Sequence, residues 1–163
     1  MNIRIPILAL CFSLPGQMFG DTAIDLSRFQ LQVEKGAQAN AEIVDDSEEG
    51  QKALVVTVSK PGPEFWSVEL RAPGFKFEAA KHYELKFRAK SVPGEYVYFV
   101  VEKDSGDQES VALGTTLKMP GQWTECTVDF DVNQNGDPGR LTISDLSVDP
   151  SSFRFRDFRL IEK

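Results

Sequence analysis

Cysteine and histidine are scarce in this chain. Its 163 residues include two cysteines, Cys11 and Cys126, and one histidine, His82. Because Cys11 lies in an N-terminal segment that we expect to be removed, the remaining chain can form no internal disulfide and must rely on a hydrophobic core. Cys126 and His82 alone are also too few ligands for a zinc site built from cysteine and histidine. His82 falls on the polar face of an expected strand with no serine or thiol nucleophile in sequence reach, so we predict no catalytic residues.

Basic residues are fewer than acidic residues. Lysine and arginine total 18, aspartate and glutamate total 25, and the formal net charge is −7. Removal of the N-terminal segment takes away Arg4 alone among the charged residues, which leaves 17 basic and 25 acidic residues and a charge of −8. A protein of this charge repels nucleic-acid phosphates and anionic lipids. We therefore expect neither nucleic acid nor a membrane surface as a partner.

The N-terminal apolar run, residues 5–14, is too short to cross a bilayer, which takes roughly 20 apolar residues. It follows Arg4 and ends at Pro15, the order of a secretory signal peptide. We predict a signal peptide at 1–20, cleaved after Gly20 or a few residues to either side, and one domain at 21–163 that is secreted or periplasmic. Cys11 is a poor lipoprotein site because Leu10 precedes it where a small residue is expected.

The rest of the chain shows no long stretch with helical spacing. Short segments that alternate between apolar and polar residues are separated by clusters of glycine, proline, aspartate, asparagine and serine. This pattern predicts an all-β domain, a sandwich or jelly roll. The expected strands cover residues 29–33, 41–44, 53–59, 65–72, 82–91, 96–102, 110–116, 123–131, 141–144 and 153–161.

Alternation also assigns side chains to faces, because neighbours on a strand point to opposite sides of the sheet. In residues 96–102, Val97, Phe99 and Val101 form the core side. Tyr96 and Tyr98 are then left on the other side. Exposed apolar clusters on a soluble protein often mark a contact site, although the two tyrosines would also suit a simple cover of the sheet under a loop.

Four segments of the expected domain are informative together: FWSVEL at 65–70, KHYELKFRAK at 81–90, GQWT at 121–124 and FRDFRL at 155–160. In this order they resemble carbohydrate-binding modules of the family 4, 9 and 22 type, within the galactose-binding-domain-like jelly rolls. The resemblance covers nearly the whole expected domain. It implies a jelly-roll β-sandwich of two antiparallel sheets, with one sheet from the strands around 53, 155, 85 and 126 and the other from those around 68, 142, 98 and 113. It also implies a poly- or oligosaccharide held in a groove on the second sheet.

The ligand residues implied by that arrangement combine aromatic and polar side chains. Aromatic faces pack against the C–H side of a sugar ring, and charged or hydroxyl groups bond to its hydroxyls. Alternation places Trp66 on the core side with Val68 and Leu70, but its position near a strand start also allows it to lean into the groove. Trp123 is expected to be buried. The predicted ligand-binding residues are Phe65, Trp66, Glu69, Arg71, Tyr96, Tyr98, Arg140 and Thr142.

Structural calcium is a further expectation, although no cofactor is required. The resemblance implies a calcium ion at Asp157 in the last strand. A second candidate matches the opening of a calcium loop, with side-chain oxygens at alternate positions. The match is partial, because Thr142 stands where a closing glutamate belongs, and Asn-Gly is also a common turn. The residues of this second candidate are Asp131, Asn133, Asn135 and Asp137.

These observations favour a secreted, monomeric and non-catalytic protein that binds a glycan. The alternative is an exterior structural or protein-interaction β-sandwich that binds no sugar. A third reading, a hydrolase that uses some of the many carboxylates, stays open because an acidic chain offers many carboxylate pairs.

Overall fold

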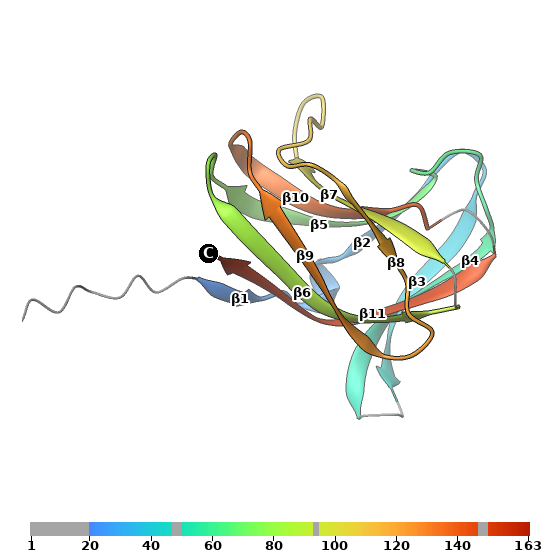
Figure 1. Cartoon of the computed structure of the whole chain (residues 1–163). Coiled ribbons are helices and arrows are strands. Elements are labelled where there is room, and N and C mark those ends of the chain that lie inside the picture. Colours follow the sequence, from blue (N-terminus) through green and yellow to red (C-terminus); the bar gives the residue numbers. More distant parts are fainter. Residues whose placement is uncertain (1–19, 47–49, 93–94, 147–149) are drawn as a thin grey trace, which may run out of the picture.

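The computed structural model of the chain describes residues 20–46, 50–92, 95–146 and 150–163. Except for Gly20, the predicted signal peptide lies outside these residues. The described residues form β-strands and one short 3-10 helix, η1 (Leu26–Arg28), so the all-β prediction is confirmed (Figure 1). In this part of the chain, no helix has the length and apolar character needed to span a membrane.

The strands pack as two antiparallel sheets. In the six-stranded sheet the order is β3-β4-β11-β6-β9, and β1 pairs with β11. Its strands are β1 (Asp21–Ala23), β3 (Gln38–Asp46), β4 (Gln51–Lys60), β6 (His82–Ser91), β9 (Thr124–Asp131) and β11 (Ser151–Glu162). In the five-stranded sheet the order is β2-β5-β10-β7-β8. Its strands are β2 (Gln30–Val33), β5 (Val68–Phe77), β7 (Tyr96–Lys103), β8 (Thr115–Lys118) and β10 (Gly136–Ser144).

The division of strands between the sheets follows the expected jelly-roll order. The strands around 53, 155, 85 and 126 are β4, β11, β6 and β9, and those around 68, 142 and 98 are β5, β10 and β7. The strand expected at 110–116 was placed too early. Ser110 and Ala112 make isolated bridges only, to Glu102 and Val132, and β8 begins at Thr115.

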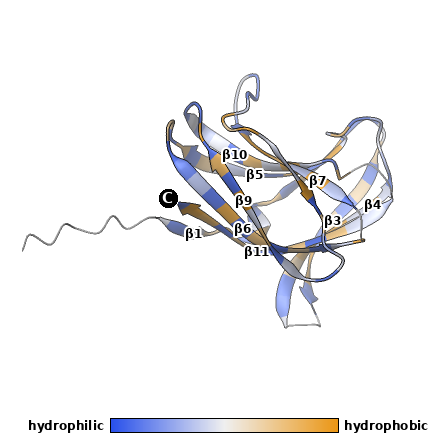
Figure 2. Ribbon diagram, in the orientation of Figure 1, coloured by the Kyte–Doolittle hydropathy of each residue, from blue (hydrophilic) through white to orange (hydrophobic). Residues whose placement is uncertain are grey.

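Alternation along β6 supplies much of the core. Tyr83, Leu85, Phe87 and Ala89 are buried, whereas the residues between them are half-buried. Phe87 stacks on Phe158 of β11 with 5.0 Å between the ring centroids. Figure 2 shows hydrophobic and hydrophilic residues following one another along the strands, as two-sided sheets with one buried face require.

The start of β10 differs from the sequence prediction. Residues 136–139 read as turn-formers, and the strand was expected only from 141, but β10 begins at Gly136. Its pairing with β5 contains register shifts on both sides of Gly139. A Cβ atom on Gly139 would lie 2.6 Å from Cδ2 of Phe77 and 2.9 Å from the Gly136 carbonyl oxygen. Glycine therefore allows the backbone to approach β5 here, next to Arg140.

Candidate functional site

The outer face of the five-stranded sheet carries a pocket of about 450 Å³. Its lining residues come from β5, β7, β10, the connection after β2, the segment before β5 and the connection after β7. They are Glu34, Phe65, Trp66, Glu69, Arg71, Glu102, Asp107, Gln108 and Arg140. We call this hollow the polar pocket. Of the ligand residues predicted from the sequence, Phe65, Trp66, Glu69, Arg71 and Arg140 are brought together here.

Glu69 and Arg71 form a close ion pair on β5. They lie two residues apart and therefore share a face of the strand, opposite the buried Leu70 and Ala72. The Nε and Nη2 atoms of Arg71 donate to Oε2 of Glu69 at 2.9 and 2.6 Å. The Glu69 side chain is only 7% exposed. Burial raises the pKa of its carboxyl above the ordinary value, and this effect outweighs the opposing hydrogen bond from Arg71.

Arg140 is held by a second set of contacts between β10 and β7. Its Nε and Nη2 atoms donate to Oε2 of Glu102 at 3.1 and 2.9 Å, and Nη2 also donates to Oε1 of Gln108 at 2.8 Å. Thr142 donates its hydroxyl to the same Glu102 oxygen at 2.8 Å. The Arg140 side chain is 6% exposed and Thr142 is buried. Both residues therefore support the floor of the polar pocket, and Thr142 does not line it.

Gln108 lies in the connection after β7, whose two ends are held together by contacts between Lys103 and Glu109. Its φ angle of 58° lies in the left-handed region, which is uncommon for residues other than glycine. The base of this connection is fixed by Lys103, whose Nζ is 2.6 Å from Oε2 of Glu109. The backbone nitrogen of Lys103 also donates to the Glu109 carbonyl oxygen at 2.9 Å. This backbone conformation places the Gln108 side chain within hydrogen-bond distance of Arg140.

Phe65 and Trp66 lie in the segment just before β5. Phe65 is 56% exposed, and Trp66 is half-buried with the Lys35 ammonium 5.1 Å from its ring centroid. Alternation extended back from Val68 assigned Trp66 to the core. That assignment was wrong because β5 begins only at Val68, and alternation does not apply to the turn that precedes it.

The two tyrosines of β7 lie in different surroundings. Tyr98 is half-buried, and its ring meets Phe65 edge-on with 6.4 Å between centroids. Its hydroxyl lies so close to Gly114 that a Cβ atom there would be 1.8 Å away. Tyr96 is 48% exposed, pairs with Lys118 of β8 and does not line the polar pocket. Tyr98 thus flanks the pocket, whereas Tyr96 lies beyond it.

Sequence reasoning missed Glu34, Glu102, Asp107 and Gln108 as pocket residues. Glu102 could have been predicted, since alternation along β7 places it on the same face as Tyr96 and Tyr98. The other three lie outside strands, where no periodicity indicates the direction of a side chain.

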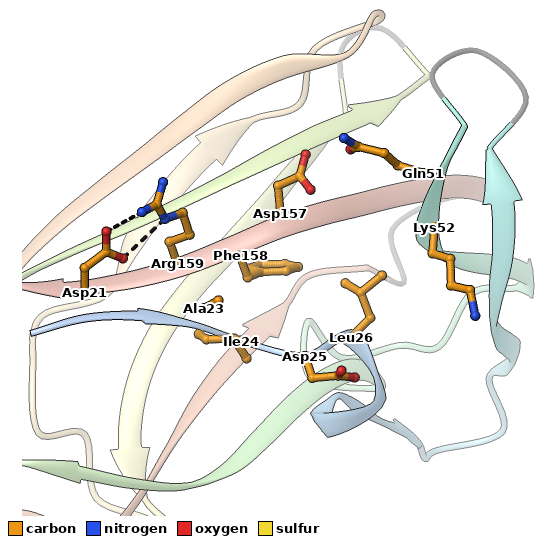
Figure 3. A pocket seen from close by; sticks show the side chains of 10 residues that line it. All are labelled: Asp21, Ala23, Ile24, Asp25, Leu26, Gln51, Lys52, Asp157, Phe158 and Arg159. Carbon is orange, nitrogen blue, oxygen red and sulfur yellow. Dashed lines mark hydrogen bonds and ion pairs between the residues drawn. The ribbon is translucent and has the colours of Figure 1, made fainter.

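Asp157 lies in a larger hollow of about 770 Å³ between β1, η1, β4 and β11 (Figure 3). It occupies an irregularity in β11, with a φ of 57°, and its side chain is 45% exposed. Two other carboxylates line this hollow and are already engaged. Asp21 accepts from Nε of Arg159 at 3.2 Å, and Asp25 accepts from the Ser27 backbone nitrogen at 2.8 Å.

Calcium has an incomplete set of oxygen ligands in this hollow. The Asp157 carboxylate and the Gln51 amide face the same space, whereas Lys52 and Arg159 contribute positive charge (Figure 3). Among the described residues, no group of three or more histidine, cysteine, aspartate or glutamate side chains is arranged to hold a metal ion. Calcium at Asp157 stays a prediction, for which Asp157 and Gln51 are the residues that would hold the ion.

The second calcium candidate is divided between β9, a connection and β10. Oδ1 of Asp131 lies 2.9 Å from Nδ1 of His82, and Oδ1 of Asn135 accepts from the Ala79 backbone nitrogen at 2.8 Å. Asn133 is exposed, and Asp137 lies within β10. Two of the four expected ligands therefore have other partners, and calcium at this place also stays a prediction.

Comparison with known proteins gives a family. Residues 28–145, most of the chain, match the sequence profile of CBM_4_9, described as a carbohydrate binding domain. No curated protein sequence matches the chain. The fold is similar to a CBM4 structure, with 13% identity over 83% of this chain and 86% of that chain and a TM-score of 0.69.

Two further solved structures have the same fold. One is the N-terminal cellulose-binding domain of β-1,4-glucanase C from Cellulomonas fimi, with 16% identity over 83% of this chain and 88% of that chain and a TM-score of 0.62. The other is the family 11 carbohydrate-binding module from Clostridium thermocellum, with 13% identity over 87% and 95% and a TM-score of 0.59. The profile match and the sandwich fold agree, and the chain belongs to the CBM_4_9 family of carbohydrate binding domains.

Proposed function

We propose that this chain is an exported, non-catalytic domain that binds a poly- or oligosaccharide on the outer face of the five-stranded sheet. The observation that carries the proposal is the polar pocket, where the rings of Phe65 and Trp66 adjoin the Glu69–Arg71 ion pair. Aromatic faces suit the apolar side of a sugar ring, and a carboxylate beside a guanidinium suits its hydroxyls. Small-molecule sites combine apolar walls with a few convergent polar groups in this way.

The known ligands of similar structures support a sugar as the ligand. The Cellulomonas fimi domain is a cellulose-binding domain, and the Clostridium thermocellum module was solved with a β-1,3-1,4-mixed-linked tetrasaccharide. The contacts of two of the pocket carboxylates, Glu69 and Glu102, favour binding over catalysis. Glu69 is held by Arg71, and Glu102 by Arg140 and Thr142, so both are engaged in stable ion pairs and hydrogen bonds.

A glycan array tests this function directly. We expect the protein to bind at least one class of immobilised poly- or oligosaccharide, and Phe65→Ala combined with Trp66→Ala to weaken that binding by about tenfold or more, as for other aromatic anchors. Ile43→Ala is the matched control, because Ile43 is an exposed apolar residue on β3 of the other sheet. If the array shows no binding, the domain is the exterior structural or protein-interaction sandwich instead.

Export is the second part of the proposal. The basic residue, the short apolar run and the proline-glycine break at residues 4–16 support it. We expect N-terminal sequencing of exported protein to find a start at about residues 21 to 24. Retention of Met1 in exported protein contradicts cleavage. Size-exclusion chromatography of the same sample is expected to show a monomer.

A further inference from the structure

The ion pair on β5 leaves one acceptor and one donor available side by side. Both hydrogen bonds from Arg71 end on the same Glu69 oxygen, Oε2. Within the described residues, neither Oε1 of Glu69 nor Nη1 of Arg71 has a hydrogen-bond partner. The Arg71 side chain is 23% exposed, so its free edge is open to the polar pocket.

Arg140 differs from Arg71 in this respect. Its Nε and Nη2 atoms are taken by Glu102 and Gln108, and Nη1 lies 3.7 Å from Oδ1 of Asp104. The Arg140 side chain is also only 6% exposed, so its remaining N–H groups have little access to a ligand in the pocket. At the pocket floor, Glu69 and Arg71 are therefore the ion pair that can form hydrogen bonds with a ligand.

We infer that Glu69 and Arg71 together recognise two hydroxyls on adjacent carbons of one sugar ring. One hydroxyl donates to Oε1 of Glu69, and its neighbour accepts from Nη1 of Arg71. An ionised carboxylate only accepts hydrogen bonds and a guanidinium only donates them, whereas a hydroxyl does both. Two neighbouring hydroxyls can therefore bond to the carboxylate and the guanidinium at the same time. This inference rests on the proposed sugar-binding function and specifies its ligand class.

The consequence is a preference between glycosidic linkages. In a 1,4-linked chain of glucopyranose or xylopyranose, each internal sugar keeps free hydroxyls at carbons 2 and 3, which are adjacent. In a 1,3-linked chain the oxygen at carbon 3 is in the glycosidic bond, and the free hydroxyls at carbons 2 and 4 are not adjacent. The domain should therefore bind 1,4-linked chains in preference to 1,3-linked chains of the same sugar.

Linkage-matched polysaccharides test this preference. The probes are β-1,4-glucan, β-1,3-glucan, β-1,4-xylan and β-1,3-xylan, together with the glycan that binds best on the array. We expect about tenfold or tighter binding to a 1,4-linked polymer than to its 1,3-linked partner, the difference that one lost charged hydrogen bond produces. Periodate cleaves vicinal diols, so periodate oxidation followed by borohydride reduction should abolish binding to whichever glycan binds best.

The results separate this inference from the function on which it rests. Equal binding to a 1,3-linked polymer, or binding that survives periodate, overturns the diol inference and leaves the sugar-binding function intact. Absence of binding to every probe and to the whole array overturns both.

Substitutions test whether glycan binding depends on the Glu69–Arg71 ion pair. Glu69→Gln and Arg71→Gln should each weaken binding by about tenfold or more, because each replaces a charged partner of the diol by a neutral amide. Glu78→Gln is the matched control. Glu78 lies two residues from Lys76, at 3.4 Å, as Glu69 lies two residues from Arg71, but it is outside the polar pocket. If thermal unfolding shows that Glu69→Gln is folded and its affinity equals that of Glu78→Gln, Glu69 does not contact the ligand.

Discussion

Tyr98 and Gly114 make a contact that leaves no room for a methyl group. Alanine at Gly114 would place its Cβ atom 1.8 Å from the Tyr98 hydroxyl. We therefore expect Gly114→Ala to displace the Tyr98 ring and to lower the free energy of unfolding by about 1 to 3 kcal/mol, the usual cost of overpacking. Urea denaturation measures this change.

The Tyr98→Ala background provides the control for that prediction. With the ring removed, Gly114→Ala should cost much less than in the parent protein. Tyr98→Ala itself should fold, since Tyr98 is half-buried on the outer face, and it should bind glycan more weakly because it supports Phe65. If Gly114→Ala costs the same in both backgrounds, the two residues are not in contact.

His82 lies between two aspartates of β9. Its Nδ1 is 2.9 Å from Oδ1 of Asp131, and its Nε2 is 3.5 Å from Oδ1 of Asp129. The hydrogen bond to Asp131 is the main cause that raises the pKa of His82 above its ordinary value of 6.5. Because the chain has a single histidine, NMR titration of the imidazole protons should report this pKa without ambiguity.

The sign of the linked pH effect follows from the raised pKa. Protonated His82 contributes stability that is fully present below the unfolded-state value of 6.5 and disappears as pH rises through the higher folded-state pKa. Asp131→Asn should therefore lower the His82 pKa and should reduce the Tm more at about pH 5.5 than at about pH 8.5. An equal reduction at both pH values contradicts this linkage.

β10 illustrates how a strand departs from local sequence preference. The run Gly136-Asp137-Pro138-Gly139 favours a turn, yet it pairs with β5 through two register shifts. Tertiary contacts decide its conformation, because glycine permits the close approach to Phe77. Local reasoning had no access to that contact.

Gly139→Ala tests how much the close approach of Gly139 to Phe77 matters for the strand. The new Cβ atom would meet Phe77 at 2.6 Å and the Gly136 carbonyl oxygen at 2.9 Å, so backbone must shift. We expect a loss of about 1 to 3 kcal/mol in the free energy of unfolding and weaker glycan binding, since Arg140 follows directly.

Gly136→Ala is the graded control for that change. The closest atoms to its new Cβ would be the Val111 methyl carbons at 3.3 Å, a milder contact. It should cost less than Gly139→Ala in the same denaturation experiment. A larger cost for Gly136→Ala contradicts the packing at Gly139.

Strands whose residues alternate regularly could be predicted well. β6 has its apolar and polar residues where alternation placed them, and on β7 Val97 and Phe99 are buried while Tyr96 is exposed. Where a strand ends, the period gives no information: strict alternation puts Trp66 on the core side, whereas it lines the polar pocket, as its position near a strand start allowed. β8 was placed too early because the alternation at 110–116 continues through isolated bridges.

Across the whole domain, the sheet order could be predicted but the polar pocket only in part. The strand assignment came from the family resemblance, and it put Glu69, Arg71 and Arg140 on one face. The pocket also depends on Gln108 and Asp107, which lie in a connection where Gln108 has a left-handed φ that no sequence pattern indicated.

Calcium removal is a test at the level of the whole domain. If Asp157, or the residues between Asp131 and Asp137, hold calcium, the ion stabilises the folded state by mass action. Excess EDTA should then lower the Tm, and added calcium should restore it. Asp157→Asn, which keeps the shape of the side chain, should abolish the response if the ion lies at Asp157. An unchanged Tm with and without calcium removes both sites.

The central claim is that a glycan binds on the outer face of the five-stranded sheet. NMR titration of backbone amides with a soluble oligosaccharide, taken from the glycan class that binds on the array, tests it most directly. We predict that the chemical-shift changes concentrate at residues 65–71 before and within β5, at 102–108 and at 140–142 of β10, which surround the polar pocket. Changes confined to the six-stranded sheet or to the hollow at Asp157, or no changes at all, would contradict it.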